Sequence, residues 1–126
     1  MRIYIGVAVV LALVLALGLF TLDGLKESAE KMVAGFDGLE NAIDSGNWDE
    51  AGEGIGKMQN MWSGYKGWWA MVVDHQEIDN IDMALVRVSR YVSMHDRAMA
   101  AGELAVLRQM LEHIPDKERV NLKNIF

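Results

Sequence analysis

The chain has 126 residues, with 18 acidic against 12 basic side chains, no cysteine and a hydrophobic share of 52%. This length suits one domain at most, and the composition is too hydrophobic for a disordered tail. The lack of cysteine excludes disulfides, thiolate metal sites and a cysteine nucleophile. The acidic balance argues against nucleic acid as a partner, because nucleic-acid binders need an excess of Lys and Arg.

Residues 3–22 form a run of twenty residues without a charged side chain, dominated by Val, Leu and Ala. A helix of that length spans roughly 30 Å, the thickness of the hydrocarbon core of a bilayer. The run is longer than the roughly 7–15 apolar residues of a signal peptide, although Ala16 and Gly18 resemble the small residues before a cleavage site. We therefore expect an uncleaved anchor over residues 1–22, with a cleaved signal peptide as the alternative.

The charges on either side of this run indicate its orientation. Arg2 and the amino terminus precede it, whereas Asp23, Lys26 and Glu27 follow it. The positive-inside bias then places the N-terminus in the cytoplasm. We expect a single-pass protein of the cell membrane, with residues 23–126 as an extracytoplasmic helical domain.

Charge is unevenly distributed within the downstream domain. Residues 23–82 carry 4 lysines against 13 acidic residues, while residues 83–126 carry 7 basic against 5 acidic residues. This asymmetry predicts that the two halves attract each other in the fold or offer faces of opposite sign to a partner. A plain solvated acidic surface is the alternative.

Apolar side chains recur at helical spacing in four stretches of the downstream domain. These stretches run from Leu25 to Ile43, from Trp48 to Val72, from Ile78 to Val92 and from Ala100 to Ile114. The segment Ser45-Gly46-Asn47 ends the first helix, and Pro115 is expected to stop the fourth. Residues 116–126 are expected to add a short helix that docks through Leu122, Ile125 and Phe126.

Local motifs mark where these helices begin. Asn47 with Glu50, and Asp74 with Glu77, have the spacing of a capping box, in which the side chain of each residue bonds the backbone amide of the other. Asp96 is a plausible N-cap for the fourth helix. Within the second helix, Gly52 and Gly56 lie one turn apart, so either a neighbouring backbone approaches closely there or the helix is weak.

No segment alternates with period two between turn signals, so the fold class is all-α. Four helices joined by short turns run antiparallel to their neighbours. The architecture is an N-terminal transmembrane helix followed by an antiparallel four-helix bundle or by a tetratricopeptide-like pair of helical hairpins. The residues Trp48-Asp49-Glu50-Ala51 favour the second form, while the incomplete repeat signature favours the first.

One group of side chains has metal-ligand chemistry. His75, Asp79 and Asp82 follow one another at i, i+4 and i+7, so they share a helix face, where an imidazole and two carboxylates can hold a divalent metal. Capping and a solvated first helical turn are the structural alternative. His113 is expected to bond the last carbonyls of its helix, and His95 is expected to face water in a turn.

A second group indicates an interaction surface rather than chemistry. Met61 and Trp68 lie off the buried stripe of their helix, where they are available to a partner, the membrane interface or another helix. Asp74 and Glu77 lie near them in the sequence and complete this candidate surface. Neither a nucleophile elbow nor a phosphate-binding glycine loop occurs, so we expect no catalytic residues, no enzyme and no cofactor.

Several segments resemble a known family. The segment WWAMVVDHQEIDNIDMAL at residues 68–85, LEHIP at 111–115, Glu118 and NIF at 124–126 follow one N-terminal apolar helix. Together they are similar to the bacterial family catalogued as domain of unknown function 4363. The resemblance implies a small membrane-anchored protein, chiefly of spore-forming and related Gram-positive bacteria, and it brings no established activity.

The sequence therefore predicts a membrane-anchored helical module that binds another membrane protein or a second copy of itself, through a domain held at the bilayer by residues 3–22. The alternative is a sensor that binds a metal or small ligand through the face of His75, Asp79 and Asp82. Both functions are forms of binding, and neither requires catalysis.

Overall fold

The computed structural model describes the backbone of residues 1–125 and the side chains of residues 1–120. Its helices are α1 (Arg2–Val33), α2 (Phe36–Ser45), α3 (Trp48–Val72), α4 (His75–Ser93) and α5 (Arg97–Ile125). Within the described backbone no residue is in a strand, which confirms the all-α prediction.

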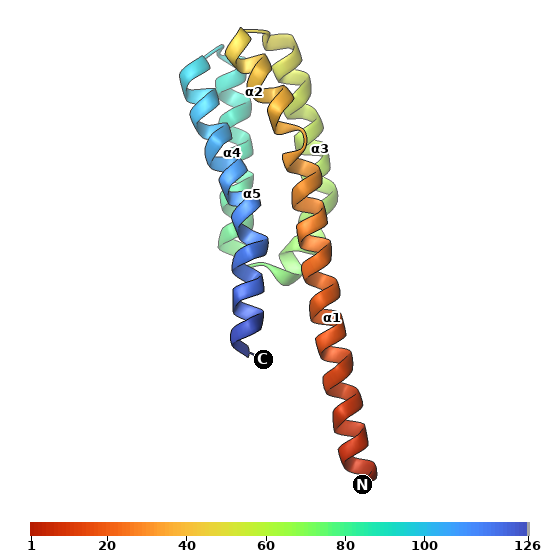
Figure 1. Ribbon diagram of the computed structural model, residues 1–126. Coiled ribbons are helices and arrows are strands. Elements are labelled where there is room, and N and C mark those ends of the chain that lie inside the picture. Colours follow the sequence, from red (N-terminus) through yellow and green to blue (C-terminus); the bar gives the residue numbers. More distant parts are fainter. Residues whose placement is uncertain (126) are drawn as a thin grey trace.

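The apolar N-terminal run and the first helix of the bundle are one continuous helix, α1 (Figure 1). The helix passes from residue 22 to residue 23 without a break, so no linker separates the apolar run from the bundle. The apolar run is long enough to cross a membrane, and residues 3–17 are exposed, while Gly18, Thr21 and Leu22 at its end are half-buried. From Leu25 onward, by contrast, one face of α1 lies in the core.

The helix predicted from Leu25 to Ile43 is interrupted, because α1 ends before Ala34-Gly35 and α2 starts after it. The Gly35 amide bonds to the carbonyl of Met32, three residues back rather than the usual four. Glycine also has low helix propensity, which favours a break at this point. Both linking residues keep right-handed helical dihedrals, so the buried stripe continues across the break from Met32 to Phe36.

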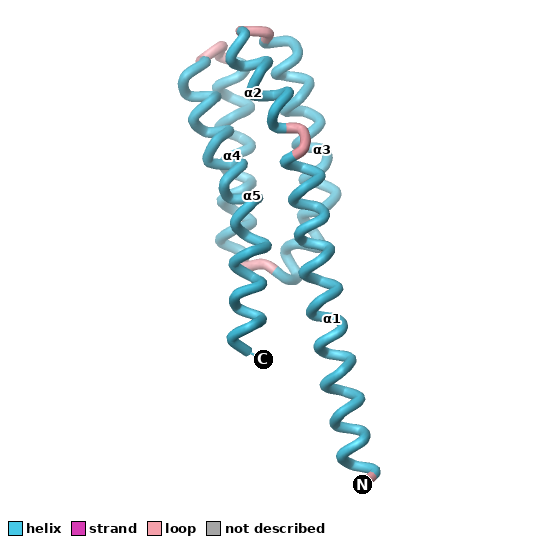
Figure 2. The backbone as a smooth tube through the Cα atoms, in the orientation of Figure 1, coloured by secondary structure: helices cyan, strands magenta, loops and turns pink. Residues whose placement is uncertain are grey.

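Together, α1 and α2 form the first side of a closed four-helix bundle. Following the chain, α3 packs on α1 and α2, α4 packs on α3, and α5 packs on α4. The last helix, α5, also packs on α1 and α2 and so closes the ring, and short loops join the helices (Figure 2). Stacked hairpins lack such a return of the last helix to the first, so the closed bundle is correct and the tetratricopeptide-like alternative is wrong.

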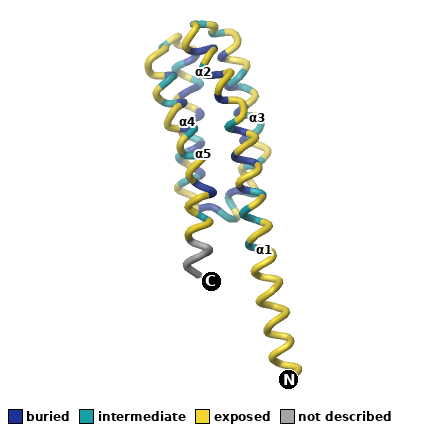
Figure 3. The backbone as a smooth tube through the Cα atoms, in the orientation of Figure 1, coloured by how far each residue is buried: buried dark blue, intermediate teal, exposed yellow. Residues whose placement is uncertain are grey.

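Buried residues form one core cluster, and Figure 3 marks them in dark blue along the helices of the bundle. The predicted stripes supply them, including Ile55, Ile81 and Leu107. The indoles of Trp62 and Trp69 meet edge to face, with ring centroids 5.5 Å apart. Such aromatic pairs contribute about 0.5–1.5 kcal/mol beyond the area that they bury.

The helix starts agree with the predicted caps in part. The Asn47 side chain accepts a hydrogen bond from the Glu50 amide at 3.3 Å, and the Asp96 side chain accepts one from the Met99 amide at 3.1 Å. The predicted partner of Asp74 is wrong, because its carboxylate accepts from the Gln76 amide at 3.2 Å instead of the Glu77 amide. The Glu77 side chain is engaged elsewhere, by α5, and does not complete a capping box.

The prediction that Pro115 stops its helix is wrong, because α5 runs through it to Ile125. A proline inside a helix costs about 3 kcal/mol, since it removes one backbone hydrogen bond and crowds the preceding turn. Here Leu111, Ile114 and Pro115 are buried against the bundle, and this packing offsets the cost. His113 therefore lies exposed within α5 and caps no helix end. The predicted docking of Leu122, Ile125 and Phe126 lies outside the described side chains.

The glycines of α3 show no close backbone approach at the predicted positions. A Cβ atom built at Gly52 or Gly56 meets no atom within 4 Å, whereas one at Gly54 would lie 3.1 Å from a methyl carbon of Leu39. Gly46, by contrast, has the positive φ of 74° that ends α2, as the sequence predicted.

Ion pairs join the acidic half of the bundle to its basic half. Arg108 and Lys117, from the basic half, form ion pairs with Asp37, Glu40 and Glu77 of the acidic half. These pairs join α5 to α2 and α4. The prediction that the two halves attract each other is therefore confirmed, although other pairs, such as Lys66 with Asp82, stay within one half.

Candidate functional site

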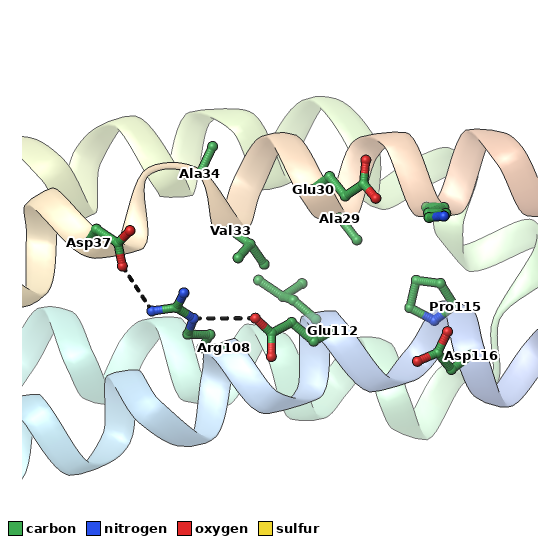
Figure 4. A pocket seen from close by; sticks show the side chains of 11 residues that line it. Ala29, Glu30, Val33, Ala34, Asp37, Arg108, Glu112, Pro115 and Asp116 are labelled. Atoms are coloured by element: carbon green, nitrogen blue, oxygen red, sulfur yellow. Dashed lines mark hydrogen bonds and ion pairs between the residues drawn. The ribbon is translucent and has the colours of Figure 1, made fainter.

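A groove of about 410 Å³ opens between α1 and α5 (Figure 4). Its apolar lining consists of Ala29, Val33, Ala34, Leu111 and Pro115. Its charged lining consists of Lys26, Glu30, Asp37, Arg108, Glu112 and Asp116. The groove therefore combines an apolar floor with a polar rim, which is the usual character of a binding site.

Small side chains and a proline line the groove. Ala29 of α1 and Ala34, which follows α1, line the groove with small side chains, which leave space that larger residues would fill. Ala34 also belongs to the break between α1 and α2. On the facing helix, Pro115 lacks the backbone N–H that would donate a hydrogen bond within α5. The groove thus lies between two local departures from regular helix.

Arg108 organises the charges of the rim. Its Nη1 atom lies 3.1 Å from Asp37 Oδ1 and 3.2 Å from Glu40 Oε1, and its Nε atom lies 3.3 Å from Glu112 Oε1. Hydrogen bonds to Glu112, Glu40 and Asp37, in that order of size, raise the pKa of Arg108 above its ordinary value. The guanidinium thereby joins α5 to α2 and stays charged at any physiological pH.

The rim keeps an acidic excess after this pairing. Within the residues whose side chains are described, Glu30 and Asp116 form no ion pair, and Lys26 forms none either. Four carboxylates and two cations line the groove in all, so its net charge is negative. Such a groove favours a ligand that carries both positive charge and apolar surface.

The predicted metal ligands have other environments. Asp82 Oδ1 accepts a hydrogen bond from Trp62 Nε1 at 2.8 Å, and Asp82 Oδ2 lies 2.7 Å from Lys66 Nζ. Burial raises the pKa of Asp82, but the bonds from Lys66 and Trp62 together with the Lys66 charge outweigh it, so the net pKa is lowered. His75 and Asp79 are exposed. In the described part of the chain, no three His, Cys, Asp or Glu side chains are arranged to hold a metal ion.

The predicted interaction residues do not form one surface. Met61 is half-buried and lines a shallow groove with residues of α1 and α2. Trp68 is half-buried over Gly24 of α1, where an added Cβ atom would lie 2.7 Å from its ring. Asp74 is exposed as the N-cap of α4, and Glu77 binds Lys117 Nζ at 2.9 Å. These four residues therefore face different neighbours.

Sequence reasoning missed two contacts between distant parts of the chain, one hydrogen bond and one pair of stacked rings. Trp69 Nε1 donates a hydrogen bond to Ser28 Oγ at 2.8 Å, and both groups are buried. His95 is exposed in a turn, as expected, and has a positive φ of 57°. Its ring stacks on Trp48, with centroids 4.9 Å apart. Neither contact has a signal in the local spacing, because each joins residues more than forty positions apart.

Comparison with known proteins identifies a family that covers most of the chain. Neither the curated proteins nor the solved structures contain a match to the chain. Residues 19–125 match the family described as "Domain of unknown function (DUF4363)". That match starts within the apolar run and extends to the last turn of α5, so it includes the groove, the ion pairs and the tryptophan core. The chain therefore belongs to the DUF4363 family.

Proposed function

We propose that this protein is a single-pass membrane protein whose helical bundle binds another protein at the membrane surface, without catalysis. The continuity of α1 carries this proposal. One helix has an apolar part that the protein leaves unburied and an amphipathic part that it packs into the bundle. An all-round apolar helix is stable in lipid and costly in water, so we assign residues 3–22 to the bilayer.

The absence of a linker has a mechanical consequence for binding. A flexible tether would let the bundle rotate freely relative to the membrane, whereas a continuous helix holds the bundle at one orientation. The groove between α1 and α5 then stays at a fixed height above the bilayer. A partner anchored in the same membrane meets it without a search over orientations, which favours a membrane neighbour or a second copy as the partner.

The α1–α5 groove is the proposed contact site. Its apolar floor and acidic rim fit a partner segment with an apolar side chain flanked by Lys or Arg. The side chains that line it supply carboxylates and cations but no hydroxyl or imidazole group, so they suit recognition better than acyl or phosphoryl transfer.

Orientation is tested with a single introduced thiol. Because the chain contains no cysteine, Ser45→Cys, at the exposed end of α2, gives one reactive site. With the N-terminus in the cytoplasm, a membrane-impermeant maleimide labels this site in intact cells as well as in permeabilised ones. Labelling only after permeabilisation contradicts the proposed orientation.

The contact site is tested by photo-crosslinking in membranes of the native host. A benzophenone amino acid at Val33, in the groove, is expected to capture a partner, whereas the same group at exposed Val86 on α4 captures none. A product of twice the chain mass identifies a second copy. The double charge reversal Glu30→Lys and Asp116→Lys is expected to abolish capture, while Asp44→Lys and Asp49→Lys, outside the groove, preserve it.

Two results would count against the contact site. One is a Val33 product that is unaffected by charge reversal in the groove. The other is the absence of any product from Val33 although the protein is folded and inserted in the membrane.

A further inference from the structure

The shallow groove at Met61, of about 300 Å³, lies between α3 and the junction of α1 with α2. Three of the nine methionines of the chain line it, namely Met32 of α1 and Met58 and Met61 of α3. We call it the methionine groove. Thioether groups are ligands for soft metal ions, so a group of them around one space is a candidate metal site.

The antiparallel packing of α1 and α2 against α3 brings these methionines together. On one side of them, Trp69 Nε1 of α3 donates a hydrogen bond to Ser28 Oγ of α1 at 2.8 Å. On the other side, a Cβ atom built at Gly54 of α3 would lie 3.1 Å from a methyl carbon of Leu39 on α2. Met32 lies between these two contacts on one wall, and the two methionines of α3 lie between them on the other.

Glycines keep the methionine groove open. Gly35, Gly38 and Gly54 line it and contribute no side chain that would fill it. A Cβ atom built at Gly38 meets no atom within 4 Å. Methionine is unbranched, with three rotatable bonds and a polarisable sulfur, so its thioether adapts to a ligand without a change of backbone. An ion therefore has space beside the three side chains.

Burial decides which kind of ion suits these ligands. Met32 and Met58 are almost completely buried, and Met61 is half-buried. The cost of removing an ion from water rises with its charge, and thioethers are neutral, so they leave that charge uncompensated. A singly charged ion is therefore favoured over a divalent one. Among singly charged ions, sulfur ligands select the soft ion Cu(I).

Carboxylates line the same groove. Glu50 and Glu53 border it together with Lys57, so its net charge is negative. Glu50 accepts a hydrogen bond from Asn47 Nδ2 at 2.8 Å. Within the described side chains, Glu53 forms no ion pair. A negative charge at the groove raises the local concentration of cations and favours their entry.

We propose that Met32, Met58 and Met61 bind one Cu(I) ion through their thioether sulfurs in the methionine groove. The ion joins α1 to α3 close to the break between α1 and α2, so its binding stabilises the folded bundle. This site lies on a different face from the α1–α5 groove and does not depend on the partner proposed there.

Methyl NMR of the full chain in detergent tests which methionines bind. The methionine methyl groups are labelled with carbon-13, and Ag(I), a soft ion that is stable to oxidation, is added in chloride-free buffer as the probe. We expect one equivalent to shift the resonances of Met32, Met58 and Met61 and to leave those of exposed Met71 and Met94 in place. Shifts confined to exposed methionines, or no shift at all, overturn the proposal.

Competition for Cu(I) against the chelator bicinchoninate, with ascorbate present, measures the affinity. The double variant Met58→Leu and Met61→Leu keeps the volume of the core and is expected to weaken binding at least about ten-fold. The exposed pair Met71→Leu and Met94→Leu is the matched control and is expected to bind as the wild type does. Equal affinities for the two double variants, or no capture of Cu(I) by the wild type, overturn the site.

Circular dichroism without metal checks that both double variants fold. If the variant at Met58 and Met61 does not, the single variant Met61→Leu replaces it, because that side chain is only half-buried. The same loss of affinity is expected for it, and wild-type affinity in the folded single variant contradicts the role of Met61.

Discussion

The two parts of α1 belong to one unbroken helix and yet lie in different surroundings. Residues 3–17 are exposed on every side, whereas Leu25, Ser28, Ala29 and Met32 are almost completely buried by other helices. The apolar content is higher in the part that the protein does not cover. Burial in this helix is therefore decided by which neighbours the fold supplies, and the fold supplies none to residues 3–17, whose proposed neighbour is the bilayer.

Charges in the first part test what that neighbour is. The double variant Val10→Arg and Leu13→Arg is expected to cost about 5–7 kcal/mol of membrane insertion, because one Arg at the centre of a span costs about 2.5–3.5 kcal/mol. We expect most of the protein to leave the membrane fraction after alkaline extraction. The matched variant Val86→Arg and Val106→Arg, on the bundle surface, is expected to remain in the membrane. Equal membrane fractions for the two variants would contradict the assignment.

The second part of α1 is held by the tryptophan core. Trp69→Ala is expected to destabilise the bundle by about 3–5 kcal/mol, since it leaves a large cavity and removes the indole N–H that donates a hydrogen bond to Ser28 Oγ. Chemical denaturation in detergent measures the change in free energy of unfolding. Met71→Ala, two residues away and exposed, is the control and is expected to change stability little. A small effect at Trp69 would mean that this part of α1 is not held as described.

Two glycines of α1 compare its parts directly. Gly24 faces the ring of Trp68, and a Cβ atom there would lie 2.7 Å from that ring, whereas Gly6 has no atom within 4 Å. Gly24→Leu is therefore expected to displace Trp68 and cost about 1–3 kcal/mol. Gly6→Leu is expected to leave bundle stability unchanged. The Tm values of the two variants are measured in the same detergent. Equal Tm values for Gly24→Leu and Gly6→Leu would contradict the different surroundings of the two parts.

Glu118 lies where the two parts of α1 meet. Burial raises its pKa above the ordinary value of 4.5, Lys117 lowers it by less, and Glu77 and Asp74 add to the rise. The charged form therefore opposes folding, and this group stabilises the fold at low pH and loses that contribution as pH rises through its folded pKa. Glu118→Gln is expected to stabilise the protein by up to ~0.5 kcal/mol at pH 7, as is usual near a surface.

The pH dependence of that effect makes the test specific. The advantage of the glutamine variant is expected to vanish below about pH 4.5, where the carboxyl group of the wild type is neutral in both states. Thermal unfolding of both proteins from pH 4 to pH 7 measures the difference. An advantage that persists at pH 4 would show that the effect comes from packing rather than from charge.

Part of the candidate site was predictable from the sequence. The acidic excess of residues 23–82 and the basic excess of residues 83–126 indicated that the halves attract each other, and Arg108 realises this in the rim of the groove. The groove itself was not predictable. It depends on Ala29 of α1 and Pro115 of α5 lining the same space between neighbouring helices, and the sequence indicated that Pro115 would end a helix.

The candidate metal site shows what the spacing of residues within one helix does not predict. His75, Asp79 and Asp82 do share the spacing of one helix face, yet spacing cannot show what other helices bring to that face. Trp62 and Lys66 of α3 occupy both carboxylate oxygens of Asp82. The partners of a surface carboxylate depend on its neighbours in the fold, which a pattern within one helix does not contain.

The sequence by itself determined the features that arise within a few turns of chain: the apolar run, the helical stripes, the N-caps at Asn47 and Asp96, and the turn at Gly46. Helical periodicity and capping are local, so short segments encode them. The tertiary structure alone decided the closure of the ring and the passage of α5 through Pro115. Those features balance local costs against burial by distant helices, and that balance exists only once the helices are packed together.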